Sequence, residues 1–366
     1  MSYPDFQKAL KVTKDTKHLE LQQIPLFDTA LQPYQILVKV IAAGVNHVDN
    51  KILDNGWATE GTGFGVTTSG IVLEIGQKVT RFQKGDTISS FQFGADAENK
   101  DQGSFQEYTK VLESQSIRFE LKSFGSGDLV PYGPIDTFEK AAAFTNVIIT
   151  NGIALYHQFQ AINNGKKKTI LIYGGSTGVG EFAVQYSHYI GWRVIAIASS
   201  GHHERLKKEG ADVLLTYHSD NLAQDIKDLN EDIDFAYVTN GGEKALKEVY
   251  DALPLNKKIK LESIDYPNID FITDKNPNIE FGYTRAFTSH GQKVKFKNFE
   301  FEPYPGTLES IKKWINIVEE LHKEGFLQTR EIRIIPAGLN GVSTALKLLK
   351  DGAARERLVV RVDKAD

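Results

Sequence analysis

The chain has 366 residues, which is enough for about two domains of ~150 residues each. Its 41% hydrophobic and 25% charged residues are ordinary for a globular protein, and a net charge of −4 favours neither nucleic acid nor an anionic membrane as a partner. The absence of cysteine excludes disulfides, thiolate catalysis and thiolate metal ligands. No apolar run reaches the ~20 residues of a bilayer-spanning helix, and the start of the chain has no apolar or Arg-rich leader, so we expect a cytoplasmic protein.

The first third of the chain is predicted to be rich in β-strands. Strand candidates lie at residues 35–43, 68–75, 87–91 and 104–111, separated by turns that contain glycine. Many short strands with this punctuation favour a partly open, barrel-like fold. Residues 138–156 then show the periodicity of a helix.

The most informative stretch begins with an apolar run, 169–173, that stops at a glycine cluster. A helical pattern follows, ends at Gly191 and leads into a second apolar run, 194–198. Strand, tight turn, helix and strand in this order form half of a dinucleotide-binding fold. Glycines let backbone N–H groups approach a pyrophosphate, and the N-terminus of the next helix carries partial positive charge. The candidate cofactor-binding residues of this turn are Gly174, Gly175, Ser176, Thr177, Gly178, Val179 and Gly180.

This turn departs from the G-x-G-x-x-G pattern at one position. In the register that starts at Gly175, Thr177 occupies the second glycine position, where a side chain limits the approach of the backbone. We therefore expect a rearranged phosphate contact that uses the hydroxyls of Ser176 and Thr177. The alternative is a tight strand-to-helix turn that binds no ligand, and the flanking strands favour the ligand.

The rest of the chain first alternates strands with helices, which continues a parallel α/β unit, and then becomes mixed. Residues 265–305 show no clear pattern. We expect the tail to pack back on the first, β-rich part, so that the α/β unit is inserted into a discontinuous one. The expected strands are 213–217, 233–238, 330–335 and 358–362, and the expected helices are 221–229, 244–253, 308–324 and 341–350.

Several short segments, in their order and spacing, resemble the medium-chain dehydrogenase/reductase superfamily. They extend over nearly the whole chain, at residues 42–49, 69–76, 84–86, 103–108 and 352–362. The resemblance implies an α/β protein in which a Rossmann doubly wound parallel sheet is inserted into a discontinuous GroES-like β-rich catalytic domain. The expected domains are residues 1–149 for the first part of the catalytic domain, 150–290 for the NADP-binding Rossmann domain and 291–366 for the C-terminal part of the catalytic domain.

Within this superfamily the chain resembles the zinc-free quinone oxidoreductase branch and the fungal trans-acting enoyl reductases. Zinc alcohol dehydrogenases place a cysteine where this chain has Asn46, and a His-Glu pair where it has Val66 and Thr67. His47 has no second ligand near it in the sequence, whereas a zinc site needs three or four. We therefore expect no metal.

The cofactor preference depends on the end of the second strand of the α/β unit. A preference for NAD usually shows there as an acidic residue that accepts hydrogen bonds from the ribose 2′-hydroxyl. This chain instead has Ser199, Ser200 and His202, with Arg205 close behind. Hydroxyls and cations without an acid favour NADP(H), although the same residues suit the polar start of a helix. The resemblance adds Tyr217 as a contact of the 2′-phosphate, Thr150 facing the nicotinamide and Asn240 near the cofactor ribose.

The absence of zinc ligands narrows the chemistry. Reduction of a C=C bond conjugated to a carbonyl, or of a quinone, spreads charge into an enolate or phenolate that ordinary hydrogen bonds stabilise, whereas a simple ketone profits from a metal. The resemblance places Asn46 and Asp49 along the nicotinamide pocket. Asn46 is then a donor to the developing oxyanion, and Asp49 holds the loop or serves as a cap or turn residue.

Trp57 stands where mitochondrial-type enoyl thioester reductases carry a tyrosine that donates a proton. An indole N–H donates a hydrogen bond but is no proton source near neutral pH. Either water protonates the enolate or the substrate is a different enone. Trp57 is then a wall of an apolar substrate pocket or a loop aromatic packed on the core.

We therefore expect a zinc-independent, NADPH-dependent oxidoreductase that reduces an enone, enal or quinone by hydride transfer. Three alternatives stay open: a zinc-free carbonyl reductase or alcohol dehydrogenase, an NADPH-binding protein without turnover, and an acyl-carrier-linked reductase that serves a synthase. We expect a small-molecule substrate, no nucleic-acid or membrane partner, and a homodimer or a monomer, the dimer by analogy alone.

Overall fold

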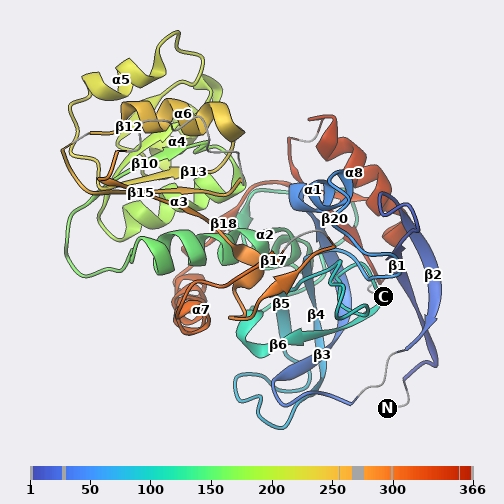
Figure 1. Ribbon diagram of the computed structural model, residues 1–366. Helices are drawn as coiled ribbons and strands as arrows, with labels where there is room; N and C mark the ends of the chain where they lie inside the picture. The colour runs from blue at the N-terminus through green and yellow to red at the C-terminus, as the bar shows by residue number, and fades with distance from the viewer. Residues whose placement is uncertain are drawn as a thin grey trace. The chain divides into compact units, whose positions relative to one another are not determined.

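The computed structural model describes residues 3–26, 30–254, 256–265, 276–297, 300–353 and 355–363. The chain divides into two compact units, Met1–Ile149 together with Phe287–Asp366, and Thr150–Ala286. In Figure 1 the blue beginning and the red end of the chain belong to the first unit, and the green and yellow middle forms the second. The expected α/β unit inserted into a discontinuous β-rich one is therefore confirmed.

An eight-stranded sheet forms the centre of the first unit, in the order β7-β5-β4-β3-β20-β19-β8, with β6 also paired to β3. The long strand β3 (Gln35–Val45) is antiparallel to β4 (Thr67–Ile75) and to β20 (Arg357–Arg361), which comes from the other end of the chain. Most of β3 is buried, which explains its nearly continuous apolar run. The other strands of this unit are β1 (Phe6–Val12), β2 (Leu19–Pro25), β5 (Thr87–Phe91), β6 (Tyr108–Leu112), β7 (Ser116–Arg118), β8 (Leu129–Val130), β9 (Gly133–Pro134), β16 (Val294–Lys295), β17 (Glu300–Phe301), β18 (Gln328–Thr329) and β19 (Ile332–Ile335).

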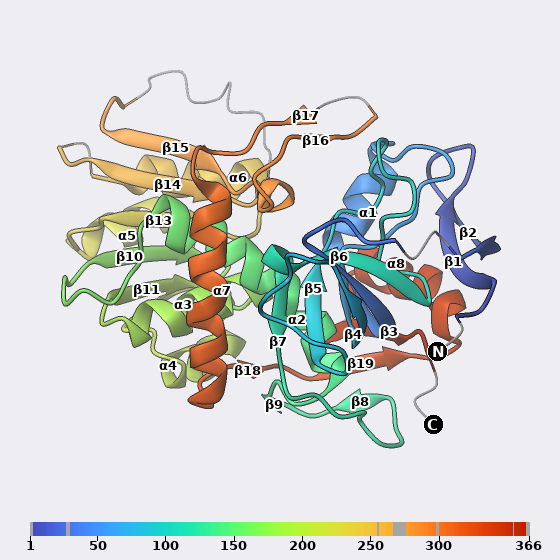
Figure 2. The same cartoon turned by 90° about the horizontal axis from the view of Figure 1, so that it is seen from below.

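Helices pack on this sheet and on one another. Their bounds are α1 (His47–Asp54), α2 (Phe138–Asn151), whose last two residues belong to the second unit, α7 (Thr307–Lys323) and α8 (Val342–Lys350). α1 lies beside α8 (Figure 1), and Asn50 Nδ2 donates a hydrogen bond to Leu346 O at 2.8 Å. The long helix α7, prominent in Figure 2, buries Trp314, whose Nε1 donates to Ile148 O of α2 at 2.8 Å.

The second unit is a six-stranded parallel sheet in the order β12-β11-β10-β13-β14-β15. The strand order reverses between β10 and β13, which is the switch point of a doubly wound sheet. Helices cover both faces (Figure 1): α3 packs on β10 and β11, and α5 and α6 share an apolar cluster with the opposite face. The elements are β10 (Thr169–Tyr173), α3 (Gly178–Tyr189), β11 (Arg193–Ile197), α4 (His203–Lys208), β12 (Val213–Leu215), α5 (Leu222–Asp228), β13 (Phe235–Val238), α6 (Gly242–Ala252), β14 (Ile259–Ser263) and β15 (Ile279–Tyr283).

Several elements differ from the sequence-based expectations. The predicted helix 138–156 is α2 followed by a π-helical turn, Gly152–Gln158. The predicted strand 104–111 is the shorter β6. The patternless segment 265–305 contains β15, β16 and β17 in its described parts, and residues 266–275, 298 and 299 lie outside the described residues. In the part of the chain that the structure describes, no helix combines the length and apolar character needed to cross a membrane.

One strand of the second unit carries a buried carboxyl group. Glu262 of β14 is 4% exposed and pairs in register with Gly282 of β15. A Cβ on Gly282 would overlap Glu262 Oε1 and lie 3.0 Å from Cδ, so only glycine leaves room for this carboxyl. Thr284 Oγ1 donates to Glu262 Oε2 at 3.3 Å. Burial is the main cause that raises the pKa of Glu262 to about 8, so the carboxyl is protonated at neutral pH.

We expect Glu262→Gln to stabilise the protein more at pH 8 than at pH 5. The folded-state pKa lies above the ordinary 4.5, so this group's contribution to stability is fully present below pH 4.5 and is lost as the pH rises through about 8. A neutral amide of the same size removes this loss, which is on the order of 3–4 kcal/mol between pH 5 and pH 8. Thermal melts at both pH values measure it, and a Tm difference that does not change with pH would contradict the prediction.

Candidate functional site

The carboxyl end of β10 turns directly into α3. Gly174 has a φ of +80°, in the left-handed region that favours glycine. A Cβ on Gly180 would overlap the carbonyl oxygen of Gly174 and lie 2.9 Å from Gly175 Cα, so glycine at 180 is what lets the helix start against the strand end. The positive end of the α3 dipole therefore lies at the switch point, where doubly wound folds bind their ligands.

Thr177 caps α3. Its Oγ1 accepts a hydrogen bond from Gly180 N at 3.0 Å and lies 2.9 Å from Thr239 Oγ1. Thr239, which follows β13, donates toward the carbonyl oxygens of Tyr173 and Gly174 at 2.9 and 3.0 Å. Threonine is a favoured N-cap residue, and the Thr177 hydroxyl caps α3. Through Thr239 it also connects the start of α3 to the ends of β10 and β13. This differs from the expected phosphate contact of that hydroxyl, and Thr239 is a residue that the sequence analysis did not single out.

The first turn of α3 supplies the remaining donors. The N–H groups of Gly178 and Val179 have no acceptor within the helix, as at any helix start, and both residues are half-buried, as is Ser176. Asn240 directly follows β13, and its backbone N lies 3.3 Å from where a Cβ on Gly174 would be. Backbone donors at the start of a helix fit a pyrophosphate.

Two residues at the end of α2 belong to this unit. Thr150 is 6% exposed, and Asn151 Nδ2 donates to Val179 O in the first turn of α3 at 3.2 Å. The π-helical turn begins directly after Asn151. Turns of this kind are rare and often lie at functional sites. Asn151 is a further residue that sequence reasoning missed, since only the fold brings it to α3.

Polar side chains gather where β11 and β12 end. Ser199 follows β11, and the short 3₁₀ turn Ser200–His202 comes next. Tyr217, 38% exposed, follows β12, and its ring centroid lies 6.4 Å from that of Tyr173. The ends of the two strands are joined by a hydrogen bond, from Ala198 N to Leu215 O at 3.0 Å. No acidic residue follows β11 before Glu204.

Arg205 of α4 is already ion-paired. Its Nη1 lies 2.6 Å from Glu181 Oε2 of α3 and 3.1 Å from Glu209 Oε1, and both carboxylates are at most 8% exposed. Burial, followed by the charge of Glu181, raises the pKa of Glu209 to about 7. With two acidic partners, Arg205 joins α3 to α4, and its interpretation as a cation available to a 2′-phosphate is revised.

In the first unit, Asn46 and Asp49 form the N-terminal cap of α1. Asn46 N donates to Asp49 Oδ2 at 2.7 Å, the reciprocal half of a capping box. Asp49 is fully buried, and burial raises its pKa to about 7, against the opposing effect of the hydrogen bonds from Asn46. A carboxyl that titrates near neutral pH is thus fixed next to Asn46.

The side chain of Asn46 is held by three groups. Its Nδ2 donates to Gly44 O and to Thr67 Oγ1, both at 3.1 Å. Its Oδ1 accepts from Asn146 Nδ2 of α2 at 3.4 Å. Both amide hydrogens of Asn46 therefore have acceptors in the protein. Asn146 is another residue that the sequence analysis missed, because no local signal links two asparagines on separate elements.

Trp57 follows α1 and packs on the core of the first unit. Its N donates to Ile52 O and its O accepts from Lys297 N, both at 2.9 Å. Its ring centroid lies 5.6 Å from that of Phe296, which is 1% exposed. The segment around Phe296, patternless in the sequence, thus forms the support of Trp57.

Of the three residues that the resemblance places at zinc-ligand positions, Asn46, Val66 and Thr67, the last two are fully buried. None of these side chains is a good zinc ligand. Among the residues that the structure describes, no group of three or more His, Cys, Asp or Glu side chains is placed to hold a metal ion.

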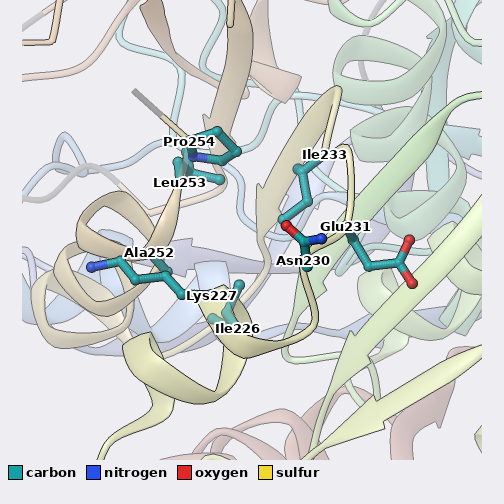
Figure 3. A pocket seen from close by; sticks show the side chains of 8 residues that line it. All are labelled: Ile226, Lys227, Asn230, Glu231, Ile233, Ala252, Leu253 and Pro254. Carbon is teal, nitrogen blue, oxygen red and sulfur yellow. The ribbon is translucent and has the colours of Figure 1, made fainter. Parts of the chain in front are cut away.

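A pocket of about 260 Å³ lies elsewhere in the second unit (Figure 3). Its lining combines apolar residues with Lys227, Asn230 and Glu231 and comes from the last turns of α5 and α6 and the segments that follow them. Ile233 in this lining precedes β13, so the pocket belongs to the amino ends of the strands. Ligands of doubly wound sheets bind at the opposite, carboxyl edge, and we therefore do not assign the cofactor to this pocket.

Comparison with known proteins identifies the first unit. Residues 32–120 match the family model of the alcohol dehydrogenase GroES-like domain. Trans-enoyl reductase milB of Cordyceps militaris is 27% identical over 96% of this chain and 97% of its own length. Trans-enoyl reductase TOXD of Cochliobolus carbonum is 29% identical over 83% of this chain and 97% of its own length.

Solved structures agree over the whole length. A protein of Rhizobium etli, described as a candidate zinc-dependent alcohol dehydrogenase, superposes with a TM-score of 0.75 at 26% identity, covering 99% of this chain and 100% of its own. The quinone oxidoreductase of Pseudomonas syringae has a TM-score of 0.67 at 18% identity, over 97% and 99% of the two chains, and so shares the fold. Over nearly its whole length the chain therefore resembles the medium-chain dehydrogenase/reductase superfamily: it contains a GroES-like domain, it is similar in sequence to trans-enoyl reductases, and it shares its fold with a quinone oxidoreductase.

Proposed function

We propose that the protein is a zinc-independent, NADPH-dependent reductase of an α,β-unsaturated carbonyl compound or a quinone. The observation that carries the proposal is the pair of sites just described. One is a glycine turn at the switch point of the second unit, and the other is an amide-rich, zinc-ligand-free site around Asn46 in the first.

The second unit would hold the cofactor at the carboxyl ends of its strands. Gly174, Gly175 and the N–H groups of Ser176, Gly178 and Val179 would receive the pyrophosphate. Asn240 and Thr150 would lie along the ribose and the nicotinamide. Ser199, Ser200, His202 and Tyr217 would surround the 2′-phosphate, while Arg205 keeps α4 against α3 through Glu181. When bound, the cofactor supplies the hydride.

The first unit would hold the substrate oxygen. Asn46 would give up its bond to Thr67 Oγ1 and donate that hydrogen to the carbonyl oxygen as charge develops there. After this exchange Thr67 Oγ1 keeps the hydrogen bond that it donates to Gly44 O at 3.4 Å. One preorganised donor of this kind stabilises an enolate or phenolate in a water-poor site. Trp57 would bound the substrate beside it.

Steady-state assays with purified protein test the proposal. NADPH oxidation is expected with an enone, an enal or a quinone and not with the matching saturated ketone, and a chelator should leave the rate unchanged. NADPH affinity without oxidation across the panel would favour the binding protein without turnover. Activity on the saturated ketone alone would favour the carbonyl reductase.

Ser199→Asp should shift the cofactor preference toward NADH. A carboxylate at the end of β11 repels the 2′-phosphate and accepts hydrogen bonds from the ribose 2′-hydroxyl. We expect the Kd for NADPH to rise about tenfold or more while that for NADH falls, as measured by fluorescence titration. Ser114→Asp, in the first unit, is the matched control and should change neither constant. An unchanged ratio in Ser199→Asp would show that this strand end does not meet the adenosine ribose.

Asp49→Asn should flatten the pH profile of kcat/KM. In the wild type a buried carboxylate forms beside Asn46 as the pH rises through about 7, and its negative charge opposes the oxyanion. The wild-type rate should therefore fall above that pH. Asparagine still accepts from Asn46 N but does not titrate, so this fall should disappear. Profiles of both proteins between pH 5.5 and 9 measure the difference, and identical profiles would contradict the role of Asp49.

A further inference from the structure

A close contact between β3 and α2 brings a second asparagine to Asn46. A Cβ on Gly44 would lie 2.6 Å from Ala142 O and 2.6 Å from Thr67 Oγ1, so the two elements approach to a distance that only glycine permits. Residues four apart share one face of a helix, which places Asn146 one turn beyond Ala142 on the side toward β3. Asn46, two residues after Gly44, therefore lies within reach of Asn146.

The partners of Asn46 define one orientation of its amide. Gly44 O is an acceptor only, so it requires the Nδ2 end of Asn46, which lies 3.1 Å away. Asn146 Nδ2 is a donor only, so it requires the Oδ1 end, which lies 3.4 Å away. If the amide were reversed, Oδ1 of Asn46 would face Gly44 O and Nδ2 of Asn46 would face Asn146 Nδ2. Acceptor would then face acceptor, and donor would face donor. Asn146 from α2 and Gly44 O thus favour the same orientation, in which the donors of Asn46 point toward Gly44 O and Thr67.

We propose that Asn146 is a positioning residue for the reduction: it holds the side-chain amide of Asn46 with its Nδ2 directed at the substrate oxygen. The inference rests on the proposed function, since it assigns to Asn146 a part in the same site. Asn146 acts through Asn46 and needs no contact with the substrate.

The surroundings favour this role over a purely structural one. Thr67 is fully buried, while Asn46 and Asn146 are half-buried, so the amide pair lies where the protein interior meets accessible space. A hydrogen bond between two neutral groups contributes modestly, which corresponds to a rate effect of about three- to tenfold when it is lost. The effect should appear in kcat, since the oxyanion is stabilised in the transition state, and not in the Kd of NADPH.

Two substitutions of Asn146 separate the hydrogen bond from packing. Asn146→Asp has nearly the same shape but replaces the donor with a carboxylate, which attracts the Nδ2 end of Asn46 and turns its amide over. Asn146→Ala removes the group altogether. Asn50→Ala is the matched control, since it deletes a side-chain amide of α1, the helix that Asn46 caps, and this amide donates to Leu346 O at 2.8 Å.

We expect kcat with the enone to fall about three- to tenfold in Asn146→Ala and further in Asn146→Asp, with the NADPH Kd unchanged. In an Asn46→Ala background, Asn146→Ala should have no further effect, because the group that it positions is gone. Asn50→Ala should lower Tm and leave kcat at the wild-type value.

A measurement that needs no turnover reports directly on the side-chain amide of Asn46. In NMR spectra of protein labelled with ¹⁵N-asparagine, the two side-chain N–H signals of Asn46 are assigned by their disappearance in Asn46→Ala. These signals should shift in Asn146→Asp and keep their positions in Asn50→Ala. Multiplicative losses in the double variant, or wild-type kcat in both folded Asn146 variants, would overturn the inference while the proposed function stands. A wild-type protein that reduces no enone or quinone would remove the proposed function and the role of Asn146 with it.

Discussion

The arrangement of β10, α3 and β13 in the second unit depends on the absence of a side chain at Gly180. Any Cβ there would overlap the carbonyl of Gly174, so α3 would have to move away from β10. Close approach allows Thr177 to cap the helix and meet Thr239 from β13 in one hydrogen-bond cluster. Strand β10, helix α3 and strand β13 are therefore fixed at one point, and the positive end of the helix is fixed with them.

Much of the fold could be predicted from the sequence because most elements bury a regular face. The run 169–173 is entirely buried, and a short, continuous apolar run of this kind is typical of a central parallel strand. The exceptions have physical causes. β2 has only half-buried and exposed positions and carries Glu20, Gln22 and Gln23, and β14 places Lys260 and Glu262 within a sheet. Helix α2 continues as a π-helical turn, which has no distinct period in the sequence.

The site was predictable where its residues are neighbours in the chain and not where the fold brings them together. The turn 174–180 and the capping pair Asn46 and Asp49 are local patterns. The pairing of Arg205 with Glu181, and that of Asn146 with Asn46, joins different elements, and residue types alone do not specify such pairs. A basic residue near a glycine turn therefore suggests a ligand even where acidic side chains of the protein already pair with it.

The place of β20 has a consequence for biosynthesis. On the side of β3 away from β4, residues 42–45 pair with Leu358–Arg361, which the ribosome adds more than 300 residues later. At about 5–20 residues per second, this edge of the nascent sheet stays unpaired for tens of seconds while the middle of the chain is translated. The parallel sheet, by contrast, has all of its strands by residue 283 and can fold before translation ends. A polypeptide whose translation stops between β15 and β20 would thus contain a folded second unit attached to an unpaired, aggregation-prone edge of β3.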